Sequence, residues 1–182
     1  CIRDRGATKK LTSFGLEVES KVFPGDISDE AFKKEFAAIT ADASVDGILM
    51  LRPLPKQINE QDIGKMIDPA KDLDGISPVN IAKVFSGDTS GFAPCTAEAV
   101  VCMLKMNDIA LSGKRVAVVG RSMVVGRPLS MLLLHENATV TICHSRTASL
   151  PEVCREADIL TACVGKAAMI NHTYVKKDAV VI

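Results

Sequence analysis

The sequence predicts an α/β fold made of two lobes, each built on a parallel sheet that helices cover. Strand-like and helix-like segments alternate along the chain, which is the pattern of consecutive βαβ units. The chain has 182 residues, of which 47% are apolar and 24% charged. That length and composition suffice for one or two domains that each bury a hydrophobic core.

The elements of the first half are predicted from apolar periodicity and from capping residues. Ser28 is expected to cap a helix, because its hydroxyl can accept from the first-turn N–H groups and acidic residues follow it. Asn59 is expected to open a second, shorter helix. The predicted helices span 28–41 and 59–67, the predicted strands span 16–22 and 45–51, and 68–78 is a predicted loop.

The second half continues the same alternation. Thr96 is expected to cap a helix that ends near residue 106, with apolar side chains at helical spacing. Strands are predicted at 116–119, 138–143, 159–162 and from 180 onward, and helices at 125–135 and 151–156. We place the domain boundary near 86–94 or along the helix that follows, which divides the chain into 1–95 and 96–182. A cleft between two such lobes is a common place for a ligand site.

The most informative segment is RVAVVGRSMVVGRP at 115–128, where a β-branched strand pattern ends at Gly120. Gly126 follows, on the predicted first turn of a helix. A strand, a glycine turn and a helix N-terminus together gather free backbone N–H groups where a dinucleotide pyrophosphate sits. Ser122 replaces the middle glycine of the usual G-x-G-x-x-G pattern, and the last interval is one residue longer. Taken alone, the segment fits a Rossmann-type NAD(P)-binding turn and an ordinary strand-turn-helix equally well.

The end of the next predicted strand bears on which dinucleotide is bound. In a Rossmann unit this end faces the adenosine ribose, where an acidic residue suits a free 2′-hydroxyl. The chain has Ser145 and Arg146 there instead, with Arg121 on the first turn. Cations and hydroxyls suit a 2′-phosphate, so NADP is favoured over NAD. The alternative is that both arginines are solvated loop residues.

The segment 71–75, Lys-Asp-Leu-Asp-Gly, is a second chemical candidate. Two carboxylates one residue apart in a tight turn can accept hydrogen bonds from the N–H groups of a pterin or a purine. The alternative is an ordinary solvated turn, because Asp and Gly are turn formers. Without further context the ordinary turn is favoured.

Composition excludes several classes of function. The formal net charge is zero, which argues against a nucleic-acid partner or an anionic membrane. No apolar run reaches the roughly 18 residues that span a bilayer. The six cysteines form no CxxC pair and have no zinc-ligand spacing with histidine. We therefore expect reduced thiols in a cytoplasmic protein without a metal site.

Taken together, these segments resemble the methylenetetrahydrofolate dehydrogenase/methenyltetrahydrofolate cyclohydrolase family. No single segment is specific, but the combination is, and it covers nearly the whole chain. The matching segments are 46–49 (DGIL), 52–56 (RPLPK), 68–69 (DP), 71–75 (KDLDG), 78–80 (PVN), 94–96 (PCT), 118–122 (VVGRS), 125–128 (VGRP), 137–141 (NATVT), 143–147 (CHSRT), 157–160 (ADIL) and 164–166 (VGK).

The resemblance implies two coupled reactions and a division of the site between the domains. NADP would take a hydride from 5,10-methylenetetrahydrofolate, and water would open the methenyl product to 10-formyltetrahydrofolate. The folate-binding and catalytic domain would be 1–95, with Asp74 anchoring the pterin ring, and the family forms homodimers. The cofactor-binding residues would be Gly120, Arg121, Ser122, Val125, Gly126, Ser145, Arg146, Val164 and Gly165 of the domain at 96–182.

The chain departs from the family on its first helix, which carries Tyr-x-x-x-Lys in the family, with the lysine serving hydrolysis. An alignment without gaps puts Arg3 and Ala7 at these positions, and a slip of two residues puts Cys1 and Arg5 there. An arginine keeps its proton at any working pH and is a poor proton shuttle. Lys9, two residues further along, is our candidate for the catalytic lysine, and Lys9 and Asp74 are the predicted catalytic residues.

A second departure precedes the proline-rich segment. The family has Gln there, and this chain has Leu51 followed by Arg52, which we assign with Asp74 to the substrate site. Compared with the family, the chain is expected to be truncated at both ends. The lost Tyr, Lys and Gln leave an alternative, a catalytically impaired NADP-binding homologue that acts as a binding or assembly partner. A third interpretation, another small NADP-dependent dehydrogenase, leaves the matches at 53–55 and 71–75 unexplained.

Overall fold

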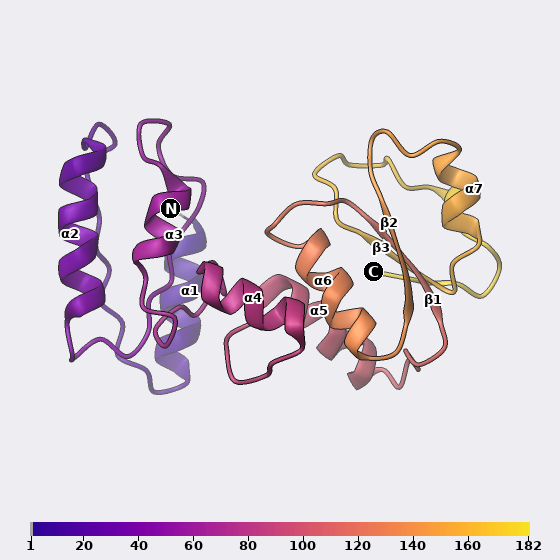
Figure 1. Ribbon diagram of the computed structural model, residues 1–182, viewed down its shortest axis with the longest axis horizontal. Coiled ribbons are helices and arrows are strands. Elements are labelled where there is room, and N and C mark those ends of the chain that lie inside the picture. Colours follow the sequence, from indigo (N-terminus) through magenta and orange to yellow (C-terminus); the bar gives the residue numbers. More distant parts are fainter. Residues whose placement is uncertain (1) are drawn as a thin grey trace.

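The molecule has two lobes that lie one after the other along its longest axis, with a connecting helix between them (Figure 1). The computed structural model describes residues 2–182, so Cys1 lies outside it, and side chains are described from Arg5 onward. The first lobe holds α1 (Ile2–Ser13), α2 (Asp29–Ala41) and α3 (Glu60–Met66), and α4 (Pro78–Ser86) connects the lobes. The second lobe holds α5 (Cys95–Met106), β1 (Arg115–Val119), α6 (Gly126–His135), β2 (Thr139–Cys143), α7 (Leu150–Arg155), β3 (Ile159–Ala162), η1 (His172–Tyr174) and β4 (Val180–Val181).

Helices α2 and α3 begin where the sequence predicts. The Ser28 hydroxyl accepts from the backbone N–H of Ala31, and the Asn59 side chain accepts from two N–H groups of α3. Their apolar faces meet in the core of the first lobe, which is centred on Phe32, Phe36 and Ile63. Burying such side chains stabilises each by about 1.5–3 kcal/mol.

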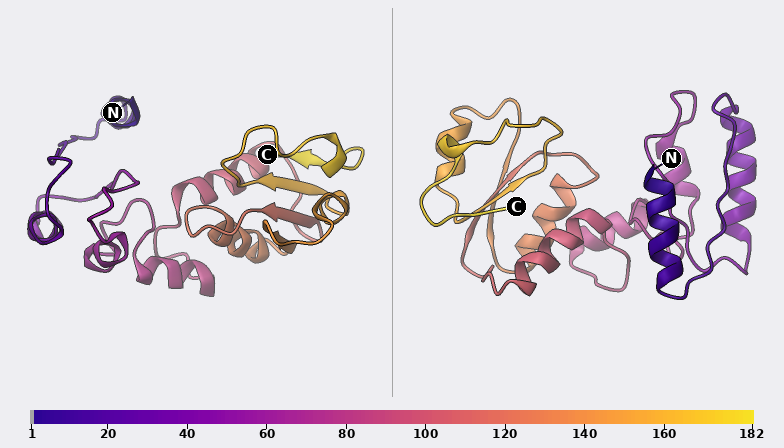
Figure 2. Two further views of the ribbon diagram at one scale, coloured as in Figure 1. Left: turned by 90° about the horizontal axis from the view of Figure 1, so that it is seen from above. Right: turned by 180° about the vertical axis from the view of Figure 1, so that it is seen from behind.

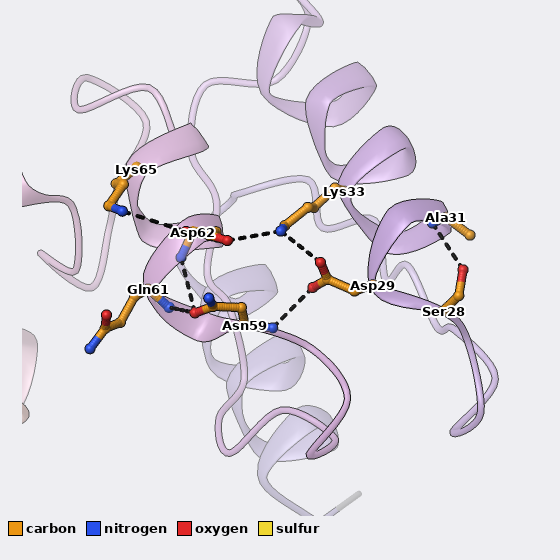
Figure 3. A network of polar contacts seen from close by, with 8 residues as sticks. All are labelled: Ser28, Asp29, Ala31, Lys33, Asn59, Gln61, Asp62 and Lys65. Atoms are coloured by element: carbon orange, nitrogen blue, oxygen red, sulfur yellow. Dashed lines mark hydrogen bonds and ion pairs between the residues drawn. The ribbon is translucent and has the colours of Figure 1, made fainter.

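A polar network ties the N-termini of α2 and α3 together on the outside of this core (Figure 3). The ammonium group of Lys33 lies 2.6 Å from an Asp29 carboxylate oxygen and 2.9 Å from one of Asp62. Asp29 also accepts from the backbone N–H of Asn59 at 3.0 Å. Asp29 of α2 therefore holds the start of α3, and Asp62 of α3 holds Lys33 near the start of α2.

Helix α1 stands apart from this core. It lies behind α3 in Figure 1 and away from α2 and α3 in the left view of Figure 2. None of its described residues belongs to a buried cluster of the lobe. Near its end, the Lys10 ammonium group lies 4.8 Å from the centroid of the Phe14 ring.

The prediction of a parallel sheet in the first lobe is wrong. Among the described residues this lobe contains no strand, only a parallel bridge between Ile48 and Asp72. Extended backbone needs a neighbour to satisfy its N–H and C=O groups, and the Ile48 segment finds one at 71–73. Segment 16–22 forms no strand, and its Leu16 and Val22 side chains are 53% and 83% exposed.

The second lobe confirms the α/β prediction. Its four strands form a parallel sheet in the order β2-β1-β3-β4. The central strand β1 is covered on both faces, because Val116 to Val119 are each at most 1% exposed. A continuous apolar run is expected for a parallel strand buried on both sides.

Helices cover both faces of this sheet. One face packs on α5 and α6 through a core that includes Leu104, Leu129 and Leu133. The other face packs on α7 and the segment around η1 through Cys154 and Leu160. The chain therefore winds to both sides of the sheet, as the βαβ pattern predicts.

Two helix starts differ from the prediction. Helix α5 begins at Cys95 with Pro94 as its N-cap, so Thr96 lies inside the helix and does not cap it. Helix α4 is absent from our sequence prediction. Its start is marked by Ser77, whose hydroxyl accepts from the N–H of Asn80, and by Pro78 at the first helical position, a combination typical of helix N-termini.

Helices α4 and α6 form the junction between the lobes. His135 Nε2, near the end of α6, lies 3.0 Å from the Val84 carbonyl oxygen of α4. The buried clusters lie at 32–67 and at 97–160, on either side of the junction. The domain limits 1–95 and 96–182 stay a prediction.

Candidate active site

A cavity of about 380 Å³ lies where a loop of the second lobe reaches the first. Most of its wall comes from the segment before and at the proline-rich turn of the first lobe. Val124, in the turn between β1 and α6, supplies the wall from the other lobe. The lining residues are Leu49, Met50, Leu51, Arg52, Pro53, Glu60, Asp74 and Val124.

An ion pair crosses the cavity wall. Arg52 Nη2 donates to Asp74 Oδ2 at 3.0 Å, and both side chains are 24% exposed. Guanidinium and carboxylate are strong partners because the donor and the acceptor are both charged. The sequence prediction assigned both residues to the substrate site, and the structure brings them together with Leu51, the third residue assigned there.

The two acids of segment 71–75 have different surroundings. Asp72 is fully buried and accepts from the backbone N–H groups of Ile76 and Ser77 and from the Asn80 amide, at 2.8–3.0 Å. It shapes the turn and has no contact with the cavity. Asp74 alone lines the cavity, so the idea of an acceptor pair made by both acids is wrong.

A close backbone contact brings the start of α5 to this turn. Gly75 has φ +60°, and a Cβ there would lie 2.7 Å from the backbone of 92–94. Beside this contact the Cys95 thiol donates to the Leu73 carbonyl at 2.9 Å. Burial, followed by the charge of Asp74, raises the pKa of Cys95. Our sequence prediction included Cys95 only as part of the matching segment 94–96 and gave it no role of its own.

Lys9 is not brought to this site. It is exposed on α1, and the described residues of α1 contribute nothing to the cavity wall. The interpretation of Lys9 as the catalytic lysine therefore finds no support in this geometry.

The glycine turn after β1 depends on two close approaches. Gly120 has φ +134°, and a Cβ there would overlap the Cys163 carbonyl oxygen after β3. A Cβ on Gly126 would overlap the Gly120 carbonyl oxygen. Both positions require glycine, which lets the start of α6 lie against the end of β1.

Ser122 stabilises the turn between these glycines. Its hydroxyl accepts from the N–H of Val125 at 3.3 Å, and its carbonyl accepts from the N–H of Arg127 at 3.0 Å. The middle glycine of the common pattern is therefore replaced by a residue that caps the turn with its side chain. The longer interval before Gly126 is accommodated by this extra capped turn.

The turn lies at the point where the sheet changes direction. The chain passes from β1 to β2 on one side and then returns to β3 on the other side of β1. In such sheets ligands bind outside the carboxyl ends of the strands at this point. The predicted residues that follow these ends are Gly120, Arg121, Ser122 and Val125 after β1, Ser145 and Arg146 after β2, and Val164 and Gly165 after β3.

The two arginines of this edge are available to an anion. Arg121 and Arg146 are exposed, and neither side chain has a hydrogen bond or an ion pair with residues 5–182. The Arg146 backbone N–H donates to His144 Nδ1 at 3.1 Å, which orders the turn that carries it. The start of α6 adds the positive end of a helix dipole.

Among the described residues the structure has neither a metal centre nor a membrane-spanning helix. No group of three or more His, Cys, Asp or Glu in that part of the chain has a geometry that suits a metal ion. None of the helices from residue 2 to residue 182 has the length and apolar character that crossing a membrane requires.

The fold and the cavity define a two-lobed α/β protein whose second lobe has the architecture of a dinucleotide-binding domain. Models of two domains of one protein family match the chain. The model described as "Tetrahydrofolate dehydrogenase/cyclohydrolase, catalytic domain" matches 5–74, and the one described as the NAD(P)-binding domain matches 94–182. The chain belongs to the tetrahydrofolate dehydrogenase/cyclohydrolase family.

Individual relatives agree with this assignment. The bifunctional protein FolD of Clostridium kluyveri is 49% identical over 179 residues, which are 98% of this chain and 63% of that protein. FolD of Campylobacter jejuni has a structure with a TM-score of 0.96 and 32% identity, over 99% of this chain and 64% of that one. The Trypanosoma brucei enzyme, solved with NADP cofactor and an inhibitor, has a TM-score of 0.91 and 30% identity, over 97% and 61%. The chain thus spans less than two thirds of these relatives.

Proposed function

We propose that the chain carries out the NADP-dependent oxidation of 5,10-methylenetetrahydrofolate to 5,10-methenyltetrahydrofolate in one-carbon metabolism. The observation that carries this proposal is the cavity shared by Asp74 and Val124. It puts an acceptor for a pterin beside the glycine turn of a dinucleotide-binding lobe. Hydride transfer needs such a juxtaposition, because donor and acceptor must be held in contact.

The residues present fit NADP. The two glycines allow a dinucleotide to approach the backbone at the end of β1, and Arg121, Ser145 and Arg146 supply cations and a hydroxyl for a 2′-phosphate. The remaining residues of this set are Ser122, Val125, Gly126, Val164 and Gly165. When bound, NADP supplies the hydride acceptor.

Asp74 has a clear role in this proposal. Its carboxylate faces the cavity, where it accepts from the N–H groups of the pterin and orients the ring. Leu51 supplies apolar wall beside it, and Val124 brings the second lobe to the same space. The site thereby orients the folate toward the lobe that binds the cofactor.

Hydrolysis of the methenyl product to 10-formyltetrahydrofolate is the second part of the proposed function. The family relatives described as bifunctional support it. Lys9, the candidate for the proton transfer, lies outside the cavity wall, so the oxidation has the stronger geometric support. None of the relatives reported above is described as a non-catalytic partner, which leaves that alternative without a supporting observation.

We also propose a homodimer in the cytoplasm. Strand β2 is an edge of the sheet, and its Ile142 is 39% exposed. Edge strands with apolar side chains are natural sites of pairing between chains. The cysteines among the described residues are free thiols, which suits a reducing compartment.

The test is a turnover assay that separates the two reactions. The chain is mixed with 5,10-methylenetetrahydrofolate and NADP, and NADPH, the methenyl species and the 10-formyl product are each followed. We expect NADPH to form, and to be lost in Asp74→Asn. NADP binding without any NADPH would contradict the proposed oxidation. Lys9→Met, compared with Lys10→Met, tests the role of Lys9 in hydrolysis, since accumulation of the methenyl species in the first variant alone would assign the proton transfer to Lys9.

A further inference from the structure

The Arg52–Asp74 pair occupies an unusual position, because both partners belong to the wall of the proposed folate site. Arg52 supplies the one cationic side chain among the residues that line this cavity, and the acids there are Glu60 and Asp74. Glu60 is already engaged, since it accepts from the Leu54 backbone N–H at 2.8 Å. The guanidinium of Arg52 therefore pairs with the acid that we assign to the pterin.

We propose that Arg52 is a positioning residue that acts on the folate through Asp74. This inference rests on the proposed function. The guanidinium holds Oδ2 of the carboxylate at 3.0 Å, and the Cys95 thiol, whose pKa is raised by burial and then by the charge of Asp74, lies near the same group. The side chain is thus held before a ligand arrives, and a carboxylate has acceptor capacity beyond one guanidinium contact.

Preorganisation is the physical reason for this role. A free aspartate at a cavity wall samples several rotamers and is hydrated, and a ligand that binds it must supply the cost of ordering. The charged hydrogen bond from Arg52 holds the Asp74 rotamer in advance, although both side chains are 24% exposed. A fixed acceptor also selects for ligands that offer N–H donors at the matching positions, because a mismatched donor leaves buried polar groups unpaired.

A direct contact between Arg52 and the folate is the competing explanation. Both explanations predict that removing Arg52 weakens binding, so a single variant does not separate them. A double-mutant cycle does, because two residues that act through one interaction have non-additive effects, whereas independent contacts add.

The experiment measures binding of folic acid to the full chain by calorimetry. The variants are Arg52→Met, Arg52→Lys, Asp74→Asn and the double variant Arg52→Met/Asp74→Asn. Arg155→Met is the matched control, because it removes an arginine from an ion pair with Glu152 outside the cavity. Circular dichroism checks that each variant is folded, and Arg52→Lys keeps the test available if Arg52→Met fails to fold.

We expect Arg52→Met to weaken folic acid binding by about tenfold or more, since hydrogen bonds to charged groups contribute at that level. Arg52→Lys should retain part of the affinity, because lysine keeps the charge and loses the planar fork. In the Asp74→Asn background, Arg52→Met should cause no further loss. Arg155→Met should bind as the unmodified chain does.

Two results would overturn the positioning role alone. One is unchanged folic acid affinity in Arg52→Met, and the other is a full additional loss when Arg52→Met is combined with Asp74→Asn. Failure of the unmodified chain both to bind folic acid and to form NADPH would overturn the proposed function together with this inference. If the unmodified chain forms NADPH, the proposed function stands even where the positioning role of Arg52 fails.

Discussion

Gly126 lies against Gly120 so closely that a Cβ on the first would overlap the carbonyl oxygen of the second. This contact joins the start of α6 to the end of β1. It explains why two glycines six residues apart are needed here, although the intervening turn is longer than usual. The position of the N-terminus of α6, where the helix dipole favours an anion, therefore depends on a contact that only glycine allows at both positions.

The first prediction concerns this contact. Gly126→Ala should destabilise the second lobe by about 1–3 kcal/mol, because the overlapping atoms are backbone and cannot rotate away. It should also abolish or strongly weaken NADP binding, since α6 must move from β1. Thermal unfolding and NADP titration measure both effects.

Gly6→Ala is the control for this change. Gly6 lies in α1 with open space around its Cβ position, and alanine is the better helix former. The Gly6→Ala variant should be as stable as the unmodified chain or slightly more stable. A Gly126→Ala variant as stable as Gly6→Ala would contradict the close approach.

The second prediction tests the choice of cofactor. Arg121→Ala should weaken NADP binding much more than NAD binding, because only NADP carries the 2′-phosphate that a cation favours. Titration of each dinucleotide measures the ratio of the two affinities. Arg115→Ala, at the opposite end of β1, should leave both unchanged. An equal loss for both cofactors in Arg121→Ala would rule out the 2′-phosphate role.

The third prediction concerns the network between α2 and α3. Hydrogen bonds with Lys33 lower the pKa of Asp29 and of Asp62, and those with the two acids raise the pKa of Lys33. A lowered carboxyl pKa stabilises the fold above the unfolded value near 3.8, and this stability is lost as pH falls through the folded value. A raised lysine pKa stabilises below 10.5, and this stability is lost as pH rises through the folded value.

Lys33→Met should therefore lower the melting temperature at neutral pH, and the difference from the unmodified chain should vanish in acid below the folded carboxyl pKa values. The effect should be modest and should shrink in high salt, because the pair is partly exposed. Lys34→Met is the matched control, since Lys34 is exposed and has no ion pair among the described residues. Melting curves measured across pH test this prediction. A lower melting temperature of Lys33→Met that persists in acid would mean that the lysine stabilises the fold by packing and not by its charge.

The fourth prediction concerns the thiols. Burial raises the pKa of Cys154 to about 12, and Cys143 beside it is also buried with a raised pKa. Because the thiolate is the reactive form, both should resist alkylation near neutral pH, while exposed Cys102 should react. Mass spectrometry after iodoacetamide treatment measures this order, with denatured protein as the control. Early labelling of Cys154 in the native protein would contradict the packing of α7 on the sheet.

Sequence reasoning succeeded where the signal is local. Ser28 and Asn59 cap their helices as predicted, because a capping hydroxyl or amide reaches only the next two or three N–H groups. The buried run 116–119 forms a strand covered on both faces. The prediction failed at 16–22, because a strand needs a partner backbone, and its sequence does not say whether one is near.

The candidate site divides in the same way. The turn at 120–126 was recognisable because its glycines, strand and helix are contiguous in the chain. The ion pair of Arg52 with Asp74 and the hydrogen bond of Cys95 to Leu73 each join residues 22 positions apart. Such contacts depend on how loops pack, which local propensity does not encode. Lys9 was predicted from its place in the sequence near the expected helical position, but the fold does not place it at the cavity.

The sequence by itself determined the α/β class, most helix limits, the glycine turn and the family resemblance, because periodicity, capping and motif spacing act over short stretches of chain. Only the tertiary structure decided that the first lobe has no sheet among its described residues, that Asp74 and not Asp72 faces the cavity, and that Arg52 holds Asp74. The physical reason is that burial and pairing are properties of surfaces brought together by folding, and a charged side chain finds its partner only when the whole chain has packed.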